Sequence, residues 1–260
     1  MPLHLFDPLK DLESRIRGGR RVLLFVDFDG TLVPIRDDPM ACRLSDEGRD
    51  LLGRIAAHPN AAAAIVSGRD LPDLRPRVGV DGLAYAGNHG LEIQGVGFEY
   101  REPGAAALAG ELAKITSELT AELAGVPGAW VQNKVLSASV HFRQTPPALV
   151  PVVKKAVEQA LRHHRDHFVL RGGKMVLEVR PAVDWHKGRA VRWLWEKLAA
   201  GDPNPVALYL GDDATDEDAF AAVPDGVTVM VGPSRQTAAR YRLDGPQDVA
   251  RFLRWLADVL

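Results

Sequence analysis

The stretch Arg21-Val22-Leu23-Leu24-Phe25-Val26-Asp27-Phe28-Asp29-Gly30-Thr31-Leu32 decides the fold of this chain. Five apolar residues rich in β-formers lead into two carboxylates spaced i, i+2, which predicts a buried strand ending in a polar turn. Carboxylates in such a place need a cation, a hydrogen-bond network or a shifted pKa. Asp27 and Asp29 therefore indicate a metal or catalytic centre, although acid-glycine turns are common and the pair could simply turn the chain.

Two later strand ends carry polar clusters of a similar kind. A predicted strand at 61–66 stops at Ser67-Gly68-Arg69, and a later apolar strand stops at Gly211-Asp212-Asp213. A helical pattern between the first two strands predicts a βαβ unit and a parallel sheet. Ligands of such sheets bind beyond the carboxyl ends of the strands, so these clusters are expected to converge. Asp27 with Asp212 would offer oxygen ligands suited to Mg²⁺, whereas the lack of a Cys and His cluster disfavours zinc.

The pattern of the sequence changes between residues 103 and 181. Helix and strand-pair patterns alternate there, and the last pair, 168–180, is predicted as two strands joined at Gly172-Gly173. Strands alternate with helices on either side of this segment. We therefore predict an α/β fold: residues 1–102 and 182–260 form a Rossmann-like parallel-sheet core with helices on both faces, and 103–181 form an inserted α+β cap domain.

Composition narrows the classes of partner. The chain has 260 residues, a formal net charge of −2 and scattered basic residues, so nucleic acid is not expected as a ligand. No apolar run approaches the ~18 residues of a spanning helix, so no membrane partner is expected. The single cysteine, Cys42, and an opening segment that mixes acids and bases favour a cytoplasmic location.

At this point the motifs resemble those of a known superfamily. Asp27 to Leu32, Ser67, Lys187 and Gly211-Asp212-Asp213, in this order, are similar to the four motifs of the haloacid dehalogenase phosphotransferases. Finer features resemble one branch, the trehalose-6-phosphate phosphatases: Leu32-Val33-Pro34-Ile35, Ser67-Gly68-Arg69, Gly87-Asn88-His89-Gly90, His141-Phe142-Arg143, Lys174 to Pro181, Lys187-Gly188 and Asp212 to Phe220. The resemblance runs from about residue 22 to residue 231.

The resemblance implies a role for each motif. Asp27 would attack phosphorus to form an aspartyl-phosphate, and Asp29 would act as general acid and then as general base. Mg²⁺ would bridge Asp27, the backbone carbonyl of Asp29, and Asp212. The expected phosphate-binding residues are Ser67, Gly68, Arg69 and Lys187, and the expected supporting residues behind the metal are Asp213 and Asp216.

Several of these residues also have a purely structural interpretation. Ser67 could cap the helix that begins near Asp70, a common use of serine. Asp213, Asp216 and Glu217 could be favourable acids at a helix start. Lys187 falls in a first helical turn, where the helix dipole disfavours a cation, and this favours a functional role.

Choice of substrate should reside in the inserted segment. The resemblance implies a cap that reaches over the phosphate site and binds the distal glucose through charged groups matching Lys134, Lys174 and Glu178. Here Gln132 stands where that family would place a glutamate, and an amide can still hydrogen-bond a hydroxyl. The full set of expected sugar-binding residues is Asn88, His89, Gln132, Lys134, His141, Arg143, Lys174 and Glu178.

The expected function is therefore a Mg²⁺-dependent phosphatase that hydrolyses trehalose 6-phosphate, with functional coupling to trehalose-6-phosphate synthase. The alternatives are a phosphatase for another sugar phosphate, such as sucrose 6-phosphate or mannosyl-3-phosphoglycerate, and a non-catalytic regulatory subunit that binds a sugar phosphate. The presence of Asp27, Asp29, Ser67, Lys187 and Asp212 argues against the regulatory alternative.

Overall fold

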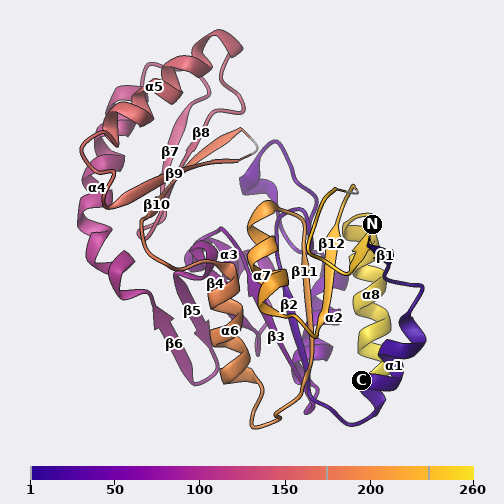
Figure 1. Ribbon diagram of the computed structural model, residues 1–260. Coiled ribbons are helices and arrows are strands. Elements are labelled where there is room, and N and C mark those ends of the chain that lie inside the picture. Colours follow the sequence, from indigo (N-terminus) through magenta and orange to yellow (C-terminus); the bar gives the residue numbers. More distant parts are fainter. Residues whose placement is uncertain (1, 174, 234) are drawn as a thin grey trace. The chain divides into compact units, whose positions relative to one another are not determined.

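The chain divides into two compact units, each described here by itself. Figure 1 shows the computed structural model, which describes residues 2–173, 175–233 and 235–260. The first unit comprises the residues up to Tyr100 together with Trp185–Leu260, and the second comprises Arg101–Asp184. The segment 103–181, expected as an insertion, lies inside the second unit.

The first unit is built on a nine-stranded sheet with the order β1-β13-β12-β11-β2-β3-β4-β5-β6. The pairs from β1 to β4 are parallel, and β5 pairs antiparallel with β4. This confirms the α/β fold with a mostly parallel sheet. The strands are β1 Leu3–His4, β2 Val22–Val26, β3 Ala61–Val66, β4 Ala84–Gly87, β5 Glu92–Gly95, β6 Phe98–Arg101, β11 Val206–Gly211, β12 Val227–Val231 and β13 Tyr241–Leu243.

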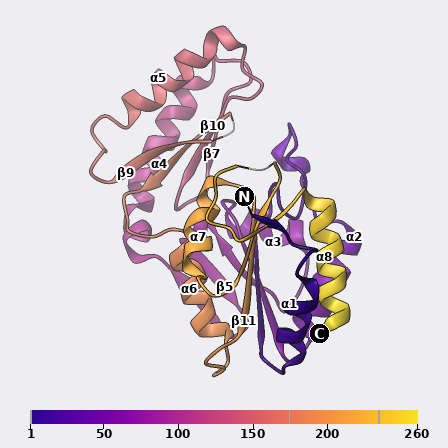
Figure 2. The ribbon, with the colours of Figure 1, turned by 45° about the vertical axis from the view of Figure 1, so that its right-hand side comes forward.

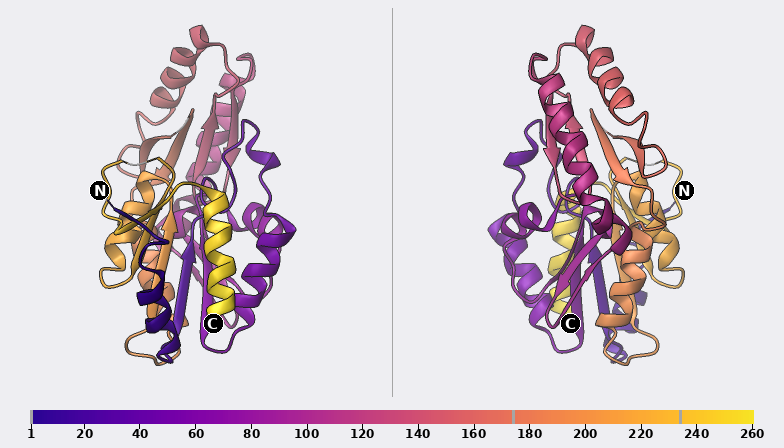
Figure 3. Two further views of the ribbon diagram at one scale, coloured as in Figure 1. Left: turned by 90° about the vertical axis from the view of Figure 1, so that its right-hand side faces the viewer. Right: turned by 90° about the vertical axis from the view of Figure 1, so that its left-hand side faces the viewer.

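Helices cover both faces of this sheet. One core contains residues of α1, α2, α3 and α8, and the other contains residues of α6 and α7 (Figure 3). The helices are α1 Leu9–Arg17, α2 Asp46–Ala57, α3 Leu71–Val78, α6 Lys187–Leu198, α7 Glu217–Ala222 and α8 Pro246–Val259. Short 3-10 helices span Pro39–Ala41, Asn88–Gly90 and Ala214–Asp216.

Strand β2 explains why the opening stretch is apolar on both sides. Val22, Leu24 and Val26 pack into the first core, whereas Leu23 and Phe25 pack into the second. A strand that is covered on both faces reads as a continuous apolar run because successive side chains alternate between two cores. Burial of each large side chain contributes about 1.5–3 kcal/mol. The carboxylates that follow are therefore held by a rigid central strand.

The apolar spacing of Leu5, Leu9, Leu12 and Ile16 favours a helix from Leu5 onward, but the beginning of the chain differs from this expectation. Leu3 and His4 instead form β1, which pairs in parallel with β13, and the helix starts only at Leu9. The edge of the sheet offers backbone partners to this segment, and Pro8, which has no N–H to donate, stands just before the helix. Apolar spacing alone could not reveal this partner strand.

The second unit packs two helices on one face of a four-stranded antiparallel sheet. The strand order is β7-β8-β10-β9, and Figure 2 shows α4 and α5 together on one side of these strands. Its elements are α4 Pro103–Leu123, β7 Trp130–Asn133, β8 Ala138–His141, the 3-10 helix Pro147–Leu149, α5 Val150–Ala160, β9 Phe168–Gly173 and β10 Val176–Pro181. Leu177 and Val179 of β10 enter the core with the helices. Val176, Glu178 and Arg180, which alternate with these residues along β10, occupy the other face of the sheet.

The turn between β9 and β10 is displaced from the expected position. Gly172 and Gly173 were expected to form it, but both belong to β9 and pair with Leu177 and Val176. The connection follows Gly173, and Met175 adopts a left-handed backbone with φ 63°. The glycine pair thus extends the strand, so the expectation of a turn at these glycines was wrong. No helix in the described part of the chain is long and apolar enough to cross a membrane.

Candidate active site

The side chains of Lys187 and Asp27 meet at the end of β2. Lys187 is the first residue of α6, and its Nζ donates hydrogen bonds of 2.7 Å each to Oδ1 of Asp27 and Oδ1 of Asp216. All three residues are buried. A buried ammonium is tolerated only when it is paired, and here two carboxylates pair with it. The structure therefore brings the expected nucleophile and the expected phosphate-binding cation into direct contact.

The charges of this cluster shift one another's pKa values. Burial raises the pKa of Asp27 well above its ordinary value, and Asp216 and Asp212 add to this effect, whereas Lys187 opposes it. Burial alone would lower the pKa of Lys187, but the carboxylates of Asp216 and Asp27 outweigh it and raise that pKa. The lysine is therefore held as a cation. The excess of acids over bases favours binding of a further cation.

Tyr209 and Asp216 complete the buried network. The Tyr209 hydroxyl on β11 donates to Oδ1 of Asp216 at 2.7 Å, and the backbone N–H of Asp213 donates to Oδ2 at 2.9 Å. Burial raises the pKa of Tyr209 well above its usual range, and the charge of Asp216 adds to it. Asp216 thus touches Lys187 directly, whereas Asp213, also expected to support the site, accepts a hydrogen bond from the backbone of Ala214.

The acids at this site fit a divalent cation that prefers oxygen ligands. Asp27, Asp212 and Asp216 each offer a carboxylate oxygen, and these atoms lie within 4.8 Å of one another. Gly30 has a φ of 90°, and a Cβ placed there would lie 2.2 Å from Oδ2 of Asp212. Only glycine lets that carboxylate approach the chain segment carrying Asp29. This donor set suits Mg²⁺, which takes few protein carboxylates and keeps several waters.

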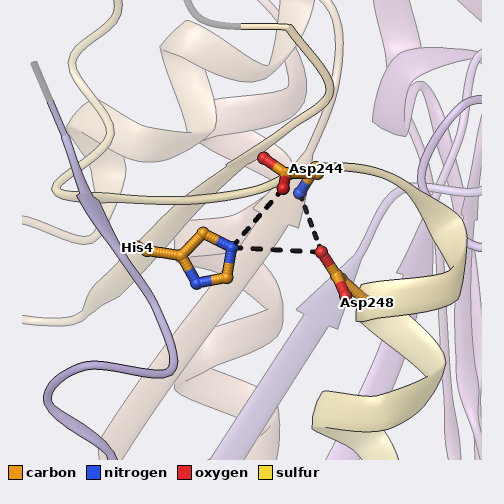
Figure 4. A group of neighbouring side chains, drawn as sticks. All are labelled: His4, Asp244 and Asp248. Atoms are coloured by element: carbon orange, nitrogen blue, oxygen red, sulfur yellow. Dashed lines mark hydrogen bonds and ion pairs between the residues drawn. The ribbon is translucent and has the colours of Figure 1, made fainter.

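A second group of possible ligands lies elsewhere in the first unit. Figure 4 shows His4, Asp244 and Asp248, with Nε2 of His4 3.8 Å from Asp244 Oδ2 and 3.9 Å from Asp248 Oδ2. Arg242 pairs with Asp244, and Arg251 donates to Asp248 at 2.8 Å. These guanidinium groups already neutralise both acids and would repel a cation. The cluster around Asp27 has three carboxylates beside one cation, Lys187, so it is the better candidate for a divalent cation.

The carboxylate of Asp29 is held by Arg69. Nε of Arg69 lies 2.5 Å from Oδ2 of Asp29, and an Nη lies 2.8 Å from Oδ1, which makes a two-pronged pair. Burial by itself would lower the pKa of Arg69, but Asp29 and Asp73 raise it. The arginine expected to bind phosphate is thus engaged with the expected acid/base residue.

Ser67, Gly68 and His89 lie together at the ends of β3 and β4. The backbone N–H of His89 donates to the carbonyl of Ser67 at 2.8 Å, and a Cβ at Gly68 would lie 2.6 Å from Cε1 of His89. The Ser67 hydroxyl accepts a hydrogen bond from the Arg69 N–H at 3.2 Å, while the side chain of Asp70 caps helix α3. Asp70, and not Ser67, is therefore the N-cap residue of α3. Asn88 is fully buried and donates to Glu92 at 2.7 Å.

In the second unit, four of the expected sugar-binding residues form two contacts on the side of the sheet opposite the helices. Nε2 of His141 lies 3.1 Å from Oε1 of Gln132, and Nζ of Lys134 lies 3.7 Å from Oε1 of Glu178. Trp130 stacks on His141 with ring centroids 3.9 Å apart. Arg143 follows β8, and Lys174 lies outside the described residues.

Sequence reasoning missed several of these contact residues. Tyr209 stands in an apolar strand, where its hydroxyl gave no positional signal. Asp73 and Arg77 carried a signal that could have found them, because they follow Arg69 at intervals of four residues on a predicted helix. Trp130 lies in none of the motifs found in the sequence. Its place on a predicted polar strand face could have marked it, because exposed tryptophans are common on binding surfaces.

The fold and the site together define the class. A mostly parallel sheet with helices on both faces, an acid pair after its central strand and an inserted α+β unit are the features of a haloacid dehalogenase-like fold. The profile of one family, described as Trehalose-phosphatase, matches residues 25–247, and the chain belongs to this family.

Individual relatives agree with this assignment. A trehalose-phosphate phosphatase from Mycobacterium avium (strain 104) is 41% identical over 252 residues, which cover 93% of this chain and 63% of the relative. This chain thus matches less than two thirds of that relative. The solved C-terminal domain of C. albicans trehalose-6-phosphate phosphatase has a TM-score of 0.82 at 25% identity and covers 100% of this chain and 99% of its own. The C-terminal domain of a Candida albicans trehalose synthase regulatory protein shares the fold, with a TM-score of 0.69 at 13% identity, covering 93% and 97%.

Proposed function

We propose that this protein is a Mg²⁺-dependent phosphatase that hydrolyses trehalose 6-phosphate to trehalose and phosphate. The observation that carries the proposal is the buried pair of Asp27 and Lys187, which lies within the segment that matches the family. A carboxylate fixed beside a permanent cation is suited to attack a phosphate dianion, because the cation offsets the repulsion between two anions.

In the first half of the proposed reaction, an oxygen of Asp27 attacks phosphorus. The bond from phosphorus to the sugar oxygen breaks, and Asp29 gives its proton to that oxygen, so trehalose leaves as a neutral alcohol. Lys187 and the hydroxyl of Ser67 hold the phosphoryl oxygens during this transfer. The product on the enzyme is an aspartyl-phosphate at Asp27.

In the second half, water attacks the phosphorus of the aspartyl-phosphate. The carboxylate of Asp29 accepts a proton from this water, and the bond between phosphorus and Asp27 breaks to release phosphate. Asp29 is then protonated again, ready for the next sugar. The pair of Asp29 with Arg69 corresponds to the carboxylate form that serves this second half.

The carboxylates of Asp27 and Asp212 and the backbone carbonyl of Asp29 are the groups that would hold Mg²⁺, and Asp216 would support the site through its contact with Lys187. When bound, the ion supplies positive charge that draws the phosphate toward the nucleophile and stabilises the transition state. The raised pKa of Asp27 supports this proposal, since an added cation would restore the carboxylate as the favoured form.

We propose that the second unit recognises the sugar through Gln132, Lys134, His141 and Glu178. These side chains present amide, ammonium, imidazole and carboxylate groups on one face of a sheet, and such groups can donate to and accept from sugar hydroxyls. In the first unit, His89 and Asn88 are proposed as further sugar contacts, and Lys174 and Arg143 remain proposals from the sequence.

A panel of phosphorylated disaccharides and monosaccharides with Mg²⁺ tests the substrate. We expect release of phosphate from trehalose 6-phosphate to exceed release from sucrose 6-phosphate and mannosyl-3-phosphoglycerate. Equal turnover of unrelated sugar phosphates would contradict the choice of trehalose. Binding of a sugar phosphate without any release of phosphate would favour the regulatory alternative.

We also infer a cytoplasmic location and functional coupling to trehalose-6-phosphate synthase. The first inference is supported by the single, unpaired cysteine, which suits a reducing compartment. The second follows from the proposed substrate, which a glycosyl-transfer reaction must supply. Added synthase with its own substrates should then sustain phosphate release by this protein.

A further inference from the structure

We propose that Arg69 and Asp73 are positioning residues that orient the carboxylate of Asp29 for catalysis. The proposal rests on the phosphatase function proposed above and assigns Arg69 a role different from the phosphate contact expected from the sequence. Three layers of contacts support it, and all lie in the first unit.

The first layer is the two-pronged ion pair between Arg69 and Asp29, called the fork below. Two nitrogens of one planar guanidinium contact the two oxygens of one carboxylate, at 2.5 and 2.8 Å. Such a two-pronged pair fixes the plane of the carboxylate, which a single hydrogen bond or a lysine would leave free to rotate. The guanidinium carbon also lies 5.6 Å from the centre of the Phe28 ring. Asp29 is thus held in orientation as well as in place.

The second layer holds Arg69 itself. Nη1 of Arg69 donates to Oδ2 of Asp73 at 2.7 Å, and Nη2 donates to the carbonyl of Pro39 at 2.8 Å. The side chain of Arg69 is only 11% exposed, and that of Asp73 is 15% exposed. With its donors engaged by Asp29, Asp73 and Pro39, the guanidinium has little freedom to reach a phosphate.

The third layer anchors Asp73. Nε of Arg77 donates to Oδ1 of Asp73 at 2.7 Å, and Nη1 of Arg77 donates to the carbonyls of Met40 and Cys42 at 2.6 and 3.0 Å. Arg77 is buried. The charges along this series alternate from Asp29 to Arg77 and sum to zero, so each charge is compensated by its neighbours.

Helix α3 explains why the series is rigid. Asp73 and Arg77 are four residues apart on α3 and face one another along one side of the helix, whereas Arg69 lies one residue before the Asp70 cap and contacts Asp73 in the first turn. The side chain of Asp73, which holds Arg69, is therefore mounted on a regular element, and support of this kind favours precise catalytic geometry.

Kinetics of Arg69→Lys and Arg69→Ala separate positioning from phosphate binding. A lysine keeps the charge but loses the fork, so we expect kcat for trehalose 6-phosphate to fall about 10- to 100-fold with KM changed less than about 3-fold. Added guanidinium ion should restore part of the kcat of Arg69→Ala. A residue that binds phosphate would instead raise KM and leave kcat closer to the wild-type value.

Asp73→Asn tests the second layer without touching Asp29. We expect a smaller loss of kcat in the same direction, and the double variant Arg69→Lys/Asp73→Asn should lose less than the product of the two single effects, because both act through one contact series. Arg75→Gln is the matched control: Arg75 is exposed on the same helix and pairs with Gln94, so its kcat should stay at the wild-type value.

Two readouts keep the outcomes distinct. Circular dichroism and thermal unfolding check that each variant is folded at the assay temperature, and a crystal structure of Arg69→Lys should show the Asp29 carboxylate rotated from its wild-type orientation. An unchanged kcat in folded Arg69→Lys would overturn the proposal, as would a rise in KM alone. A wild-type protein that releases no phosphate from any sugar phosphate would overturn the proposed function instead.

Discussion

Lys187 donates a hydrogen bond of 2.7 Å to the Asp27 carboxylate while holding Asp216 at the same distance. The lysine starts α6, and Asp27 directly follows strand β2, 160 residues earlier, so the fold alone brings them together. A cation at a helix start is opposed by the helix dipole. The buried carboxylates of Asp27 and Asp216 offset this unfavourable interaction with the dipole. A cation that needs such compensation indicates a functional arrangement.

Asp27→Asn is expected to abolish phosphate release while leaving the fold intact. The amide is nearly isosteric but is not a nucleophile, and the raised pKa of Asp27 means that its charged form is disfavoured in the fold. We expect the melting temperature in EDTA at pH 7 to stay within about 2–4 °C of the wild-type value, the shift that about 1 kcal/mol gives in a protein of this size, because loss of a disfavoured charge and loss of a partner for Lys187 oppose each other. Asp50→Asn, at an exposed position on α2, is the control and should change neither quantity. Measurable turnover by Asp27→Asn would contradict the covalent mechanism.

Tyr209→Phe should weaken both stability and catalysis. The change removes a buried hydrogen bond to the Asp216 carboxylate, which should lower the free energy of unfolding by about 1–3 kcal/mol. It should also reduce kcat several-fold, because Asp216 helps to hold Lys187. Tyr85→Phe is the matched control, since its buried hydroxyl donates to the carbonyl of Val80 away from the site. Tyr85→Phe should lose stability alone, and an equal fall of kcat in both variants would exclude a specific role for Tyr209.

Asp73 should contribute to the loss of stability in acid. Burial favours a higher pKa, but hydrogen bonds from Arg77 and Arg69 prevail and lower the pKa of Asp73. Its stabilising effect is therefore fully present above the unfolded pKa of about 3.9 and is lost as the pH falls through the lower folded value. We expect Asp73→Asn to unfold more readily at pH 7 and to lose less of its remaining stability below pH ~4. Urea titrations at several pH values measure the free energy of unfolding of both proteins. If this free energy falls equally in Asp73→Asn and in the wild type below pH ~4, the prediction is wrong.

Glu178→Ala should weaken use of the natural substrate more than use of a small one. Glu178 contacts Lys134 and Arg180 on the sheet face proposed for sugar binding. We expect kcat/KM for trehalose 6-phosphate to fall at least about 10-fold, with hydrolysis of p-nitrophenyl phosphate nearly unchanged. Glu111→Ala is the control: it removes an acid of the same unit that pairs with His164 and His167. Parallel loss on both substrates would remove Glu178 from the sugar site.

Periodicity and strand-end chemistry were sufficient to predict much of the first unit. Strand β3 has the predicted bounds, and α6 begins at Lys187 as expected, because a buried strand and an amphipathic helix each carry a strong local pattern. Strands β1 and β13 were missed, since such short segments gain their structure from pairing at the edge of the sheet. The glycine pair in β9 was misread as a turn because an antiparallel partner strand can hold glycines extended.

The candidate site was predictable as a set of residues but not as a set of contacts. Charged side chains at the ends of predicted strands and helices indicated a site, and this signal was sufficient to find Asp27, Asp212 and Lys187. Which acids pair with Lys187 depends on side-chain geometry, and in the structure Asp216 joins Asp27 as its partner. From the sequence, Arg69 was expected to bind phosphate beside Ser67. In the structure, its guanidinium group pairs with the carboxylate of Asp29.

Phosphate release from trehalose 6-phosphate, measured with EDTA and then with added Mg²⁺, tests the central claim most directly. The account predicts no release in EDTA and recovery when Mg²⁺ is restored in excess, because Asp27 needs a compensating cation to act as a carboxylate nucleophile. Undiminished release of phosphate in EDTA would contradict it.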